Sequence, residues 1–352
     1  MQPSASLMLN AQDPSETPAP RDRRGRALRD LRISVTDRCN FRCVYCMPKE
    51  VFGKDYQFLE RKEILTFEEI VRIAEVAIAE GVRKLRVTGG EPLVRRGVAT
   101  LIGSLAALPG VRDLSLTTNG VLLETLASDL ARAGLRRVNV SLDTLDRARF
   151  AKMSGRDRLP DVLRGLEAAR AAGLGPIKIN AVLLRGENEY EAVDLVRFGR
   201  DRGYEVRFIE FMPLENDRSW DIGRVVSGAE VRRSIGAEWP IVRDPEGDPH
   251  APASRFLFED GKGAVGFIDS VTAPFCSACT RIRLTSDGKF RVCLYDDNES
   301  DLRAALRGGE SDAAIASLMQ DAVMRKGRGG ALDILETRSA IPLLRTMHQI
   351  GG

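Results

Sequence analysis

Three cysteines lie close together near the start of the chain, at Cys39, Cys43 and Cys46. They follow a predicted strand over residues 31–36, so one short loop presents three thiols. Three thiolates in one loop can bind three irons of a four-iron cluster, because the irons of such a cluster are only a few ångströms apart. The fourth iron then has no protein ligand and is open to a small molecule. This arrangement is typical of a reactive cluster rather than of an electron carrier.

Two simpler roles compete for this cysteine loop. A structural zinc site normally takes four ligands in two pairs, and the loop supplies three. Disulfides fit less well, because the chain has only six cysteines in 352 residues and shows no secretory leader. Closely spaced triplets also suit metals better than cross-links. An iron–sulfur cluster is therefore favoured, and zinc is the alternative.

A second set of three cysteines lies nearer the C-terminus, at Cys276, Cys279 and Cys293. The pair Asp287-Gly288 between two alternating runs is a strong signal for a two-residue hairpin. Folding about this turn is expected to bring Cys293 opposite Ile282, within reach of Cys279. The sequence thus predicts a second site with three thiols.

The surroundings of this second triad favour a second four-iron cluster, again with one open iron. All six cysteines fall in the two triads, and neither His250 nor His348 is close to the second one in sequence. A zinc site completed by His250 or by water is the alternative. Arg281 and Arg283 follow with the same strand parity, so both point the same way from the hairpin. Arginine is suited to bidentate phosphate binding, so we expect both to contact a ligand.

The elements that must position these residues alternate between short β-rich runs and longer helical patterns. The predicted strands cover residues 31–36, 83–88, 113–118, 137–143, 177–183 and 205–211. The predicted helices cover residues 66–80, 121–133, 161–172 and 189–202, and all four stop at or just before a glycine. Repeated β-α units indicate a parallel sheet.

Polar and apolar residues alternate along these strands. In the first one, Arg32 and Ser34 alternate with Leu31 and Ile33. Parallel strands that are covered by helices on both faces are instead nearly continuous apolar runs. We therefore predict helices on the outside and a polar, cationic interior that holds a ligand. Six units predict a partial (β/α)6 barrel of the TIM type, because a closed barrel would need two more.

After Leu214 the regular alternation stops. One helix is predicted near 228–235, and two antiparallel strands at 256–259 and 264–269. Three regions are predicted: a disordered leader over 1–24, the barrel over 25–225, and a C-terminal extension over 226–352. The extension combines antiparallel β-structure with helices and carries the second triad.

The overall composition excludes several classes of protein. Hydrophobic residues make up 43% of the chain and charged residues 29%, as in an ordinary soluble globular protein. The net charge of +3 gives no general case for binding nucleic acid or a membrane. No apolar run reaches the roughly 18 residues that a membrane span needs. A leader without an apolar segment predicts a cytoplasmic protein, where thiols stay reduced.

The motifs together resemble a known family. The first cysteine loop, with Tyr45 before its last cysteine, and the strand end Gly89-Gly90-Glu91-Pro92 resemble those of the radical S-adenosylmethionine (SAM) enzymes. Within that group, the chain resembles the GTP 3′,8-cyclase family of molybdenum cofactor biosynthesis. The segments that carry this closer resemblance are 31–40, 117–120, 276–285 and the terminal Ile350-Gly351-Gly352. It extends from about Gly25 to the last residue.

The resemblance implies a lyase that converts GTP into (8S)-3′,8-cyclo-7,8-dihydro-GTP, the first step of molybdenum cofactor biosynthesis. Its implied cofactors are two [4Fe-4S] clusters and SAM, whose cleavage gives a 5′-deoxyadenosyl radical that abstracts the ribose 3′ hydrogen. The implied SAM contacts are Tyr45, Gly90, Ser141 and Met212. The implied GTP contacts are Arg32, Arg86, Thr117, Lys178, Arg281 and Arg283. The implied catalytic residues are Arg281, Arg283, Gly351 and Gly352.

The resemblance also implies partners. These are GTP, an electron donor such as flavodoxin or ferredoxin, a downstream pterin synthase and, optionally, a second copy of the chain in a homodimer. Two other functions compete with this one. A radical SAM enzyme with an auxiliary cluster could act on a peptide, although such enzymes usually carry more late cysteines. A non-enzymatic iron–sulfur or zinc protein would cleave no SAM.

Overall fold

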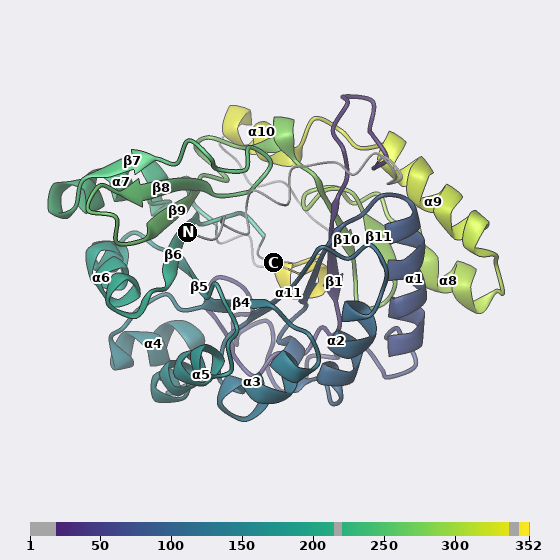
Figure 1. Ribbon diagram of the computed structural model, residues 1–352, viewed down its shortest axis with the longest axis horizontal. Coiled ribbons are helices and arrows are strands. Elements are labelled where there is room, and N and C mark those ends of the chain that lie inside the picture. The colour runs from purple at the N-terminus through teal and green to yellow at the C-terminus, as the bar shows by residue number, and fades with distance from the viewer. Residues whose placement is uncertain (1–18, 215–219, 338–344, 352) are drawn as a thin grey trace.

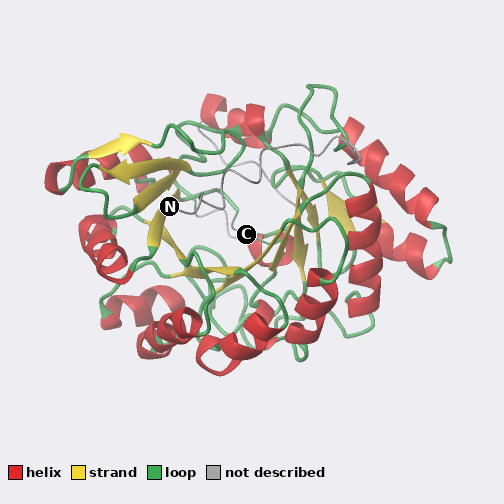
Figure 2. Ribbon diagram, in the orientation of Figure 1, coloured by secondary structure: helices red, strands yellow, loops and turns green. Residues whose placement is uncertain are grey.

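The computed structural model describes residues 19–214, 220–337 and 345–351. Their strands form one curved sheet with helices around its outer face (Figure 1, Figure 2). The strand order is β12-β11-β10-β1-β2-β3-β4-β5-β6-β9-β8-β7. The strands of the first half are β1 (Asp30–Ser34), β2 (Lys84–Thr88), β3 (Asp113–Thr118), β4 (Arg137–Ser141), β5 (Lys178–Leu183) and β6 (Glu205–Glu210). Those of the second half are β7 (Ile241–Arg243), β8 (Ser254–Phe258), β9 (Ala264–Ile268), β10 (Arg281–Leu284), β11 (Lys289–Arg291) and β12 (Ser300–Asp301).

Helices follow most of the strands and cover the outside of the sheet (Figure 1). In the first half they are α1 (Phe67–Ala79), α2 (Val98–Ala106), α3 (Leu123–Arg132), α4 (Arg147–Ser154), α5 (Leu159–Ala171) and α6 (Ala192–Arg202). In the second half they are α7 (Gly228–Glu238), α8 (Leu302–Arg307), α9 (Asp312–Met324), α10 (Gly330–Thr337) and α11 (Met347–Ile350). The six predicted strands and four predicted helices of the barrel are confirmed within a few residues, and α2 and α4 are additions.

The curved sheet continues beyond the six predicted barrel strands at both edges. Strand β10 pairs in parallel with β1, and β9 pairs in parallel with β6. Both strands were predicted as parts of antiparallel hairpins, and their parallel pairing with the edges of the barrel was not predicted. The predicted antiparallel hairpin of β8 and β9 is confirmed, and it forms one margin of this sheet.

The two faces of the barrel strands differ as their alternation predicted. Leu31 and Ile33 of β1 are fully buried in the core between the sheet and the helices. Arg32 and Ser34 of the same strand face the interior, where Arg32 lines a cavity. Helix α1 begins at a capping box in which Thr66 and Glu69 satisfy each other's backbone N–H groups. Such local signals and the apolar stripe of each helix hold the outer layer on the sheet.

Residues 19–24, which the composition assigned to the leader, make tertiary contacts. Asp22 is buried and its carboxylate pairs with Arg26 at 2.5 Å. Arg26 in turn donates to the carbonyl oxygen of Cys276 at 3.0 Å. The segment before β1 is therefore attached to the second cysteine triad.

Helix α11 lies inside the curve of the sheet rather than on its outer surface (Figure 1). His348 and Ile350 of this helix are almost completely buried. The segment before it is anchored by Arg345, whose guanidinium pairs with Asp287 at 2.9 Å and Glu299 at 2.6 Å. Within the described residues, every helix is too short or too polar to cross a lipid bilayer.

Candidate active site

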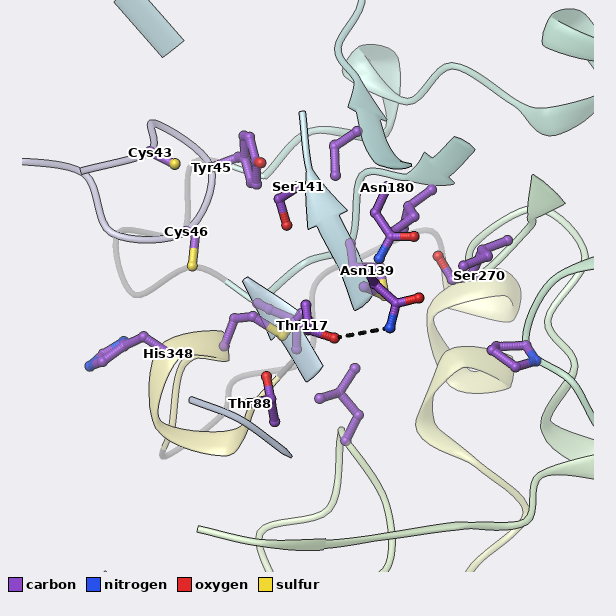
Figure 3. Close-up of a pocket in the computed structure, with 18 of the residues that line it drawn as sticks. Cys43, Tyr45, Cys46, Thr88, Thr117, Asn139, Ser141, Asn180, Ser270 and His348 are labelled. Atoms are coloured by element: carbon purple, nitrogen blue, oxygen red, sulfur yellow. Dashed lines mark hydrogen bonds between the residues drawn. The ribbon is translucent and has the colours of Figure 1, made fainter. Parts of the chain in front are cut away.

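A cavity of about 320 Å³ lies inside the curved sheet, and all six cysteines line it. Its wall includes the carboxyl ends of β1 to β6, as expected for a barrel of parallel strands. Figure 3 shows Cys43, Cys46 and Tyr45 on one side of it, opposite Asn180 and Ser270. Residues that are distant in the sequence thus share one site.

The first cysteine loop is fixed by its backbone. The guanidinium of Arg42 donates to the carbonyl oxygens of Cys39 at 2.9 Å and Phe52 at 2.8 Å. The N–H groups of Arg42 and Val44 donate to the last residues of α4, Ser154 and Met153. Hydrogen bonds of the chain itself therefore hold the loop.

Gly89 and Gly90 allow the end of β2 to approach this loop closely. A Cβ atom at position 90 would lie 2.4 Å from the carbonyl oxygen of Arg38, and one at position 89 would lie 2.5 Å from that of Thr36. Gly89 also has a φ of 138°, which favours glycine. The two glycines are required because the strand end packs directly on the residues that lead into the cysteine loop.

Glu91, the next residue, holds the neighbouring strand end. It is buried and accepts hydrogen bonds from the Thr118 hydroxyl and the Asn119 N–H group, both at 2.7 Å. Burial raises the pKa of Glu91 to about 7, and these hydrogen bonds oppose the shift. Asn119 then points back to the cysteine loop, where its amide donates to Asn40 at 2.7 Å.

All four residues expected to contact SAM, Tyr45, Gly90, Ser141 and Met212, line the cavity. The hydroxyl of Tyr45 donates to Asp143 at 2.6 Å. Burial raises the pKa of Asp143 to about 6, while the bond from Tyr45 opposes the shift. Asp143 was not among the predicted contacts, although it lies two residues beyond Ser141 with the same strand parity.

Three arginines occupy one row across three neighbouring parallel strands. Arg32 of β1 is paired through its Cα position with Arg283 of β10 on one side and with Arg86 of β2 on the other. Adjacent strands are roughly 4.8 Å apart, so three cationic side chains share one short stretch of the inner face. All three line the cavity.

Burying these arginines side by side disfavours their charged forms, which lowers their pKa values. Burial, followed by repulsion from Arg283, lowers the pKa of Arg32 to about 9. Burial and repulsion from Arg32 lower the pKa of Arg86 to about 9 as well. Within the described part of the chain, the Nε atoms of both side chains are buried without a hydrogen-bond partner. The row is therefore a set of charged donors without sufficient counter-charge.

The second cysteine triad is brought together as predicted, with one difference in register. Strands β10 and β11 are antiparallel and pair Arg283 with Arg291. Continued along the chain, this register carries Cys293 to the level of Arg281 rather than Ile282. A one-residue shift follows because the loop has three residues, 286–288, and not only the predicted Asp287-Gly288 pair.

The two triads differ in electrostatic surroundings. Burial raises the pKa of Cys39 to about 12, and the nearby Glu91 adds to the shift. At Cys279 burial also raises the pKa, but Arg281 and Lys326 outweigh it and lower the value to about 6. The second triad thus lies in a cationic environment.

The C-terminal segment reaches this cationic region. The carbonyl oxygen of Gly351 accepts a hydrogen bond from Nη1 of Arg283. A Cβ atom at position 351 would lie 2.5 Å from both Ser34 and Thr88, and the φ of 80° also favours glycine. Gly352, the other predicted catalytic residue, lies outside the described residues.

Two of the remaining predicted GTP contacts, Thr117 and Arg281, line the cavity, and Lys178 does not. Lys178 is the first residue of β5 and lies 3.7 Å from Glu205, one inward-facing position below Asn180. Burial and repulsion from Arg207 lower the pKa of Lys178 to about 7. It belongs to the layer beneath the cavity floor.

Several lining residues were not predicted as ligand contacts. Asn139 and Asn180 project from β4 and β5, and the amide of Asn139 donates to Thr117 at 3.4 Å (Figure 3). Their strand parity was the available signal, because it places them on the polar inner face. His348 and Tyr295 also line the cavity, and no local pattern in the sequence indicates either of them.

The two cysteine triads fit the two four-iron clusters that the sequence implied. Each triad offers three cysteines at the cavity wall, and thiolates are the ligands of four-iron clusters. Among the described residues, no three His, Cys, Asp or Glu side chains converge as ligands of one metal ion. The fit therefore rests on ligand chemistry. Cys39, Cys43 and Cys46 would hold one cluster and Cys276, Cys279 and Cys293 the other.

Two family comparisons divide the chain. Residues 33–199 match the radical SAM superfamily, and residues 204–331 match the molybdenum cofactor synthesis C family. A relative from Acidothermus cellulolyticus named GTP 3′,8-cyclase is 50% identical over 306 residues, which cover 87% of this chain and 84% of the relative. A relative of the same name from Rhodopirellula baltica is 47% identical over 338 residues, which cover 94% of this chain and 91% of the relative.

Solved structures support the fold. SuiB from Streptococcus suis bound to S-adenosylmethionine has a TM-score of 0.55 at 17% identity, covering 83% of this chain and 68% of that one. Another structure of SuiB has a TM-score of 0.57 at 16% identity, covering 83% of this chain and 71% of that one. These values show a shared fold, and the radical SAM assignment comes from the family match over residues 33–199.

Proposed function

Since this chain belongs to the GTP 3′,8-cyclase family of radical SAM enzymes, we propose that it converts GTP into (8S)-3′,8-cyclo-7,8-dihydro-GTP. This reaction is the first step of molybdenum cofactor biosynthesis. Its cofactors are SAM and two [4Fe-4S] clusters. When bound, the first cluster and SAM supply the 5′-deoxyadenosyl radical that removes the ribose 3′ hydrogen.

The observation that carries the substrate class is the row Arg86, Arg32 and Arg283. Burial and repulsion between neighbouring arginines lower the pKa values of all three guanidinium groups. A triphosphate would provide the missing counter-charge through charge-assisted hydrogen bonds. The row therefore favours a polyanionic nucleotide over a peptide, which was the alternative substrate.

The remaining contacts form part of the same proposal. Tyr45, Gly90, Ser141 and Met212 orient SAM beside the first triad. Thr117 and Arg281 complete the nucleotide site, and Lys178 acts from the layer below. Arg283 and the Gly351-Gly352 end act at the reacting ribose. Glycine suits that position because a side chain would collide with Ser34 and Thr88.

The protein's own contribution is position and the exclusion of water. The sheet, the cysteine loop and α11 line the cavity and would limit the access of water to bound ligands. Asp143 holds Tyr45 in place, and Glu91 fixes the strand ends next to the first triad. These residues position ligands without taking part in bond making.

The test is anaerobic reconstitution followed by an iron count and product analysis. The chain is expected to bind about eight irons and, with a reductant, SAM and GTP, to give 5′-deoxyadenosine and the cyclised nucleotide. Zinc in place of iron would overturn the enzyme assignment. SAM cleavage at the same rate with and without GTP would overturn the substrate assignment.

The wider setting follows from the same chemistry. We infer a cytoplasmic location, since six reduced thiols need a reducing compartment. An electron donor such as flavodoxin or ferredoxin would reduce the first cluster, and a pterin synthase would consume the product. A homodimer stays a prediction, as does the division of the chain at 24 and 225.

A further inference from the structure

A buried lysine adjoins the second cysteine triad. Lys326 follows helix α9 and only 5% of its surface is exposed. Its ammonium group donates to the carbonyl oxygen of Arg281 at 2.9 Å and to the sulfur of Cys279 at 3.6 Å. A charged N–H group thus points at a predicted cluster ligand.

This ammonium group has no carboxylate partner among the described residues. A buried lysine is costly unless a negative charge compensates it. The sulfur of Cys279 lies 3.6 Å from the ammonium nitrogen, and as a cluster ligand this sulfur is a thiolate. The triad is therefore the counter-charge of Lys326.

The chain around Lys326 fixes this geometry. Arg26 donates to the carbonyl oxygens of Gly327 at 2.5 Å and Cys276 at 3.0 Å, so it joins the 326–329 segment to the triad. Gly329 approaches Cys276 so closely that a Cβ atom there would lie 2.6 Å from its sulfur. Gly329, within the glycine-rich run after Lys326, is needed for this close approach.

The first triad is built differently. The side-chain donor at Cys39 is the neutral amide of Asn119, at 4.0 Å, and the largest charge effect comes from the acidic Glu91, with Arg42 opposing it. Hydrogen bonds to the sulfurs and nearby charge both set the reduction potential of a cluster. The two sites therefore differ in the two quantities that tune this potential.

We propose that Lys326 is a positioning residue that raises the reduction potential of the cluster on Cys276, Cys279 and Cys293. An oxidised four-iron cluster on three thiolates carries net negative charge, and adding one electron increases it. A fixed ammonium group favours the reduced form and lessens repulsion between the cluster and an anionic nucleotide. Lys326 acts through Cys279 and does not touch the reacting atoms.

The inference rests on the proposed function only in requiring a four-iron cluster at the second triad. The iron count and the two cluster spectra test that requirement first. The potential of the second cluster is then a separate measurement, so failure of one is distinguishable from failure of the other.

The experiment is a redox titration of the reconstituted full-length protein with dithionite, followed by electron paramagnetic resonance. Added SAM shifts the first cluster's signal and so identifies it. Lys326→Met should lower the second cluster's reduction equilibrium constant about tenfold, which is about 59 mV for one electron. The first cluster's potential should not change. Lys326→Arg should keep the second cluster's potential close to that of the wild type. The potential in Lys326→Gln should lie between those of the Arg and Met variants.

The matched control is Lys289→Met. Lys289 lies in β11, next to the second triad, and its ammonium group pairs with Asp301 rather than with a cysteine. This variant should leave both potentials unchanged. An unchanged second potential in Lys326→Met would overturn the proposal, as would an equal shift of both clusters. Loss of the second cluster in both the Met and the Gln variants would also overturn it, because Lys326 would then serve assembly rather than potential.

Discussion

Single side chains in this cavity are arranged for a ligand rather than for stability. Arg32 and Arg86 lie in one row where burial and mutual repulsion outweigh the attraction of Asp30, whereas Arg137, on the nearby β4, is paired with Asp113 at 2.8 Å. Arg137 is therefore compensated by a carboxylate of the protein, and we propose that a bound ligand compensates Arg32 and Arg86. This difference separates binding from structural roles experimentally.

Arg32→Ala is expected to weaken GTP binding about ten- to a hundredfold, because a charged hydrogen bond contributes about 1.5–3 kcal/mol. The melting temperature without GTP should stay unchanged or rise, since a buried repulsive charge is removed. Calorimetric titration with GTP and thermal unfolding measure the two effects. The control Arg137→Ala should instead lower the melting temperature, because it leaves Asp113 buried and unpaired. Equal behaviour of the two variants would contradict this assignment.

Because His348 of α11 is buried, we expect the stability of the C-terminal segment to depend on pH. Burial, with some repulsion from Arg42, lowers its pKa to about 4. The unfolded segment then binds a proton more readily than the folded one, so stability falls as pH drops from about 6.5 to 4, by at most about 1.4 kcal/mol per pH unit. Hydrogen exchange of residues 345–351 should show more opening at pH 5 than at pH 7.5. His348→Phe, which keeps the aromatic contact with Phe52, should abolish this dependence. The same pH dependence in that variant would rule out His348 as its source.

At the scale of elements, glycines mark where one segment packs directly on another. Gly90 allows β2 to reach the first cysteine loop, and Gly329 allows the residues after α9 to reach the second triad. In both cases a side chain would displace the backbone beside a cysteine. Not every glycine in the 326–330 run has this role, which provides an internal control.

Gly329→Ala should release the second cluster, because its Cβ atom would lie 2.6 Å from both Cβ and Sγ of Cys276 and its φ is 122°. Iron content should fall from about eight to about four per chain, with the first cluster's spectrum retained. The neighbouring Gly327→Ala should keep full iron, since no heavy atom lies within 4 Å of the added carbon. Full iron in Gly329→Ala would show that the segment can move away without affecting the site.

At the scale of the whole molecule, the two regions matched by different families form one sheet. Strand β9 extends β6, and β10 extends β1, so the C-terminal part covers both edges of the six-stranded barrel. Arg283 of β10 completes the arginine row that begins on β2. The proposed nucleotide site is therefore shared between the regions.

A fragment of residues 1–225 should not fold as an independent unit. It would expose the edges of β1 and β6, and unpaired strand edges favour aggregation. We expect no cooperative thermal transition and poor retention of the first cluster, compared with the full chain. Circular dichroism melting and size-exclusion chromatography check this. A monomeric fragment that melts cooperatively and binds about four irons would show that the barrel is autonomous.

The sequence by itself determined the cysteine triads, the polar inner face and the β-α order. These properties are local: ligand spacing, strand parity and helix periodicity are all set by residues near one another in the chain. The parity of Arg32 and Arg86 was enough to predict a cationic interior. The hairpin about Asp287-Gly288 was enough to predict the second triad, with an error of one residue in register.

Only the tertiary structure decided which of these residues meet. The pairing of β10 with β1 and of β9 with β6 joins segments that are far apart in sequence, and no local pattern specifies such contacts. For the same reason Lys178 could not be separated from Arg32 by sequence, although one lies below the cavity and the other lines it. The contact of Lys326 with Cys279 is likewise a product of packing. Sequence spacing fixed the chemistry that each segment offers, and long-range packing fixed where that chemistry is brought together.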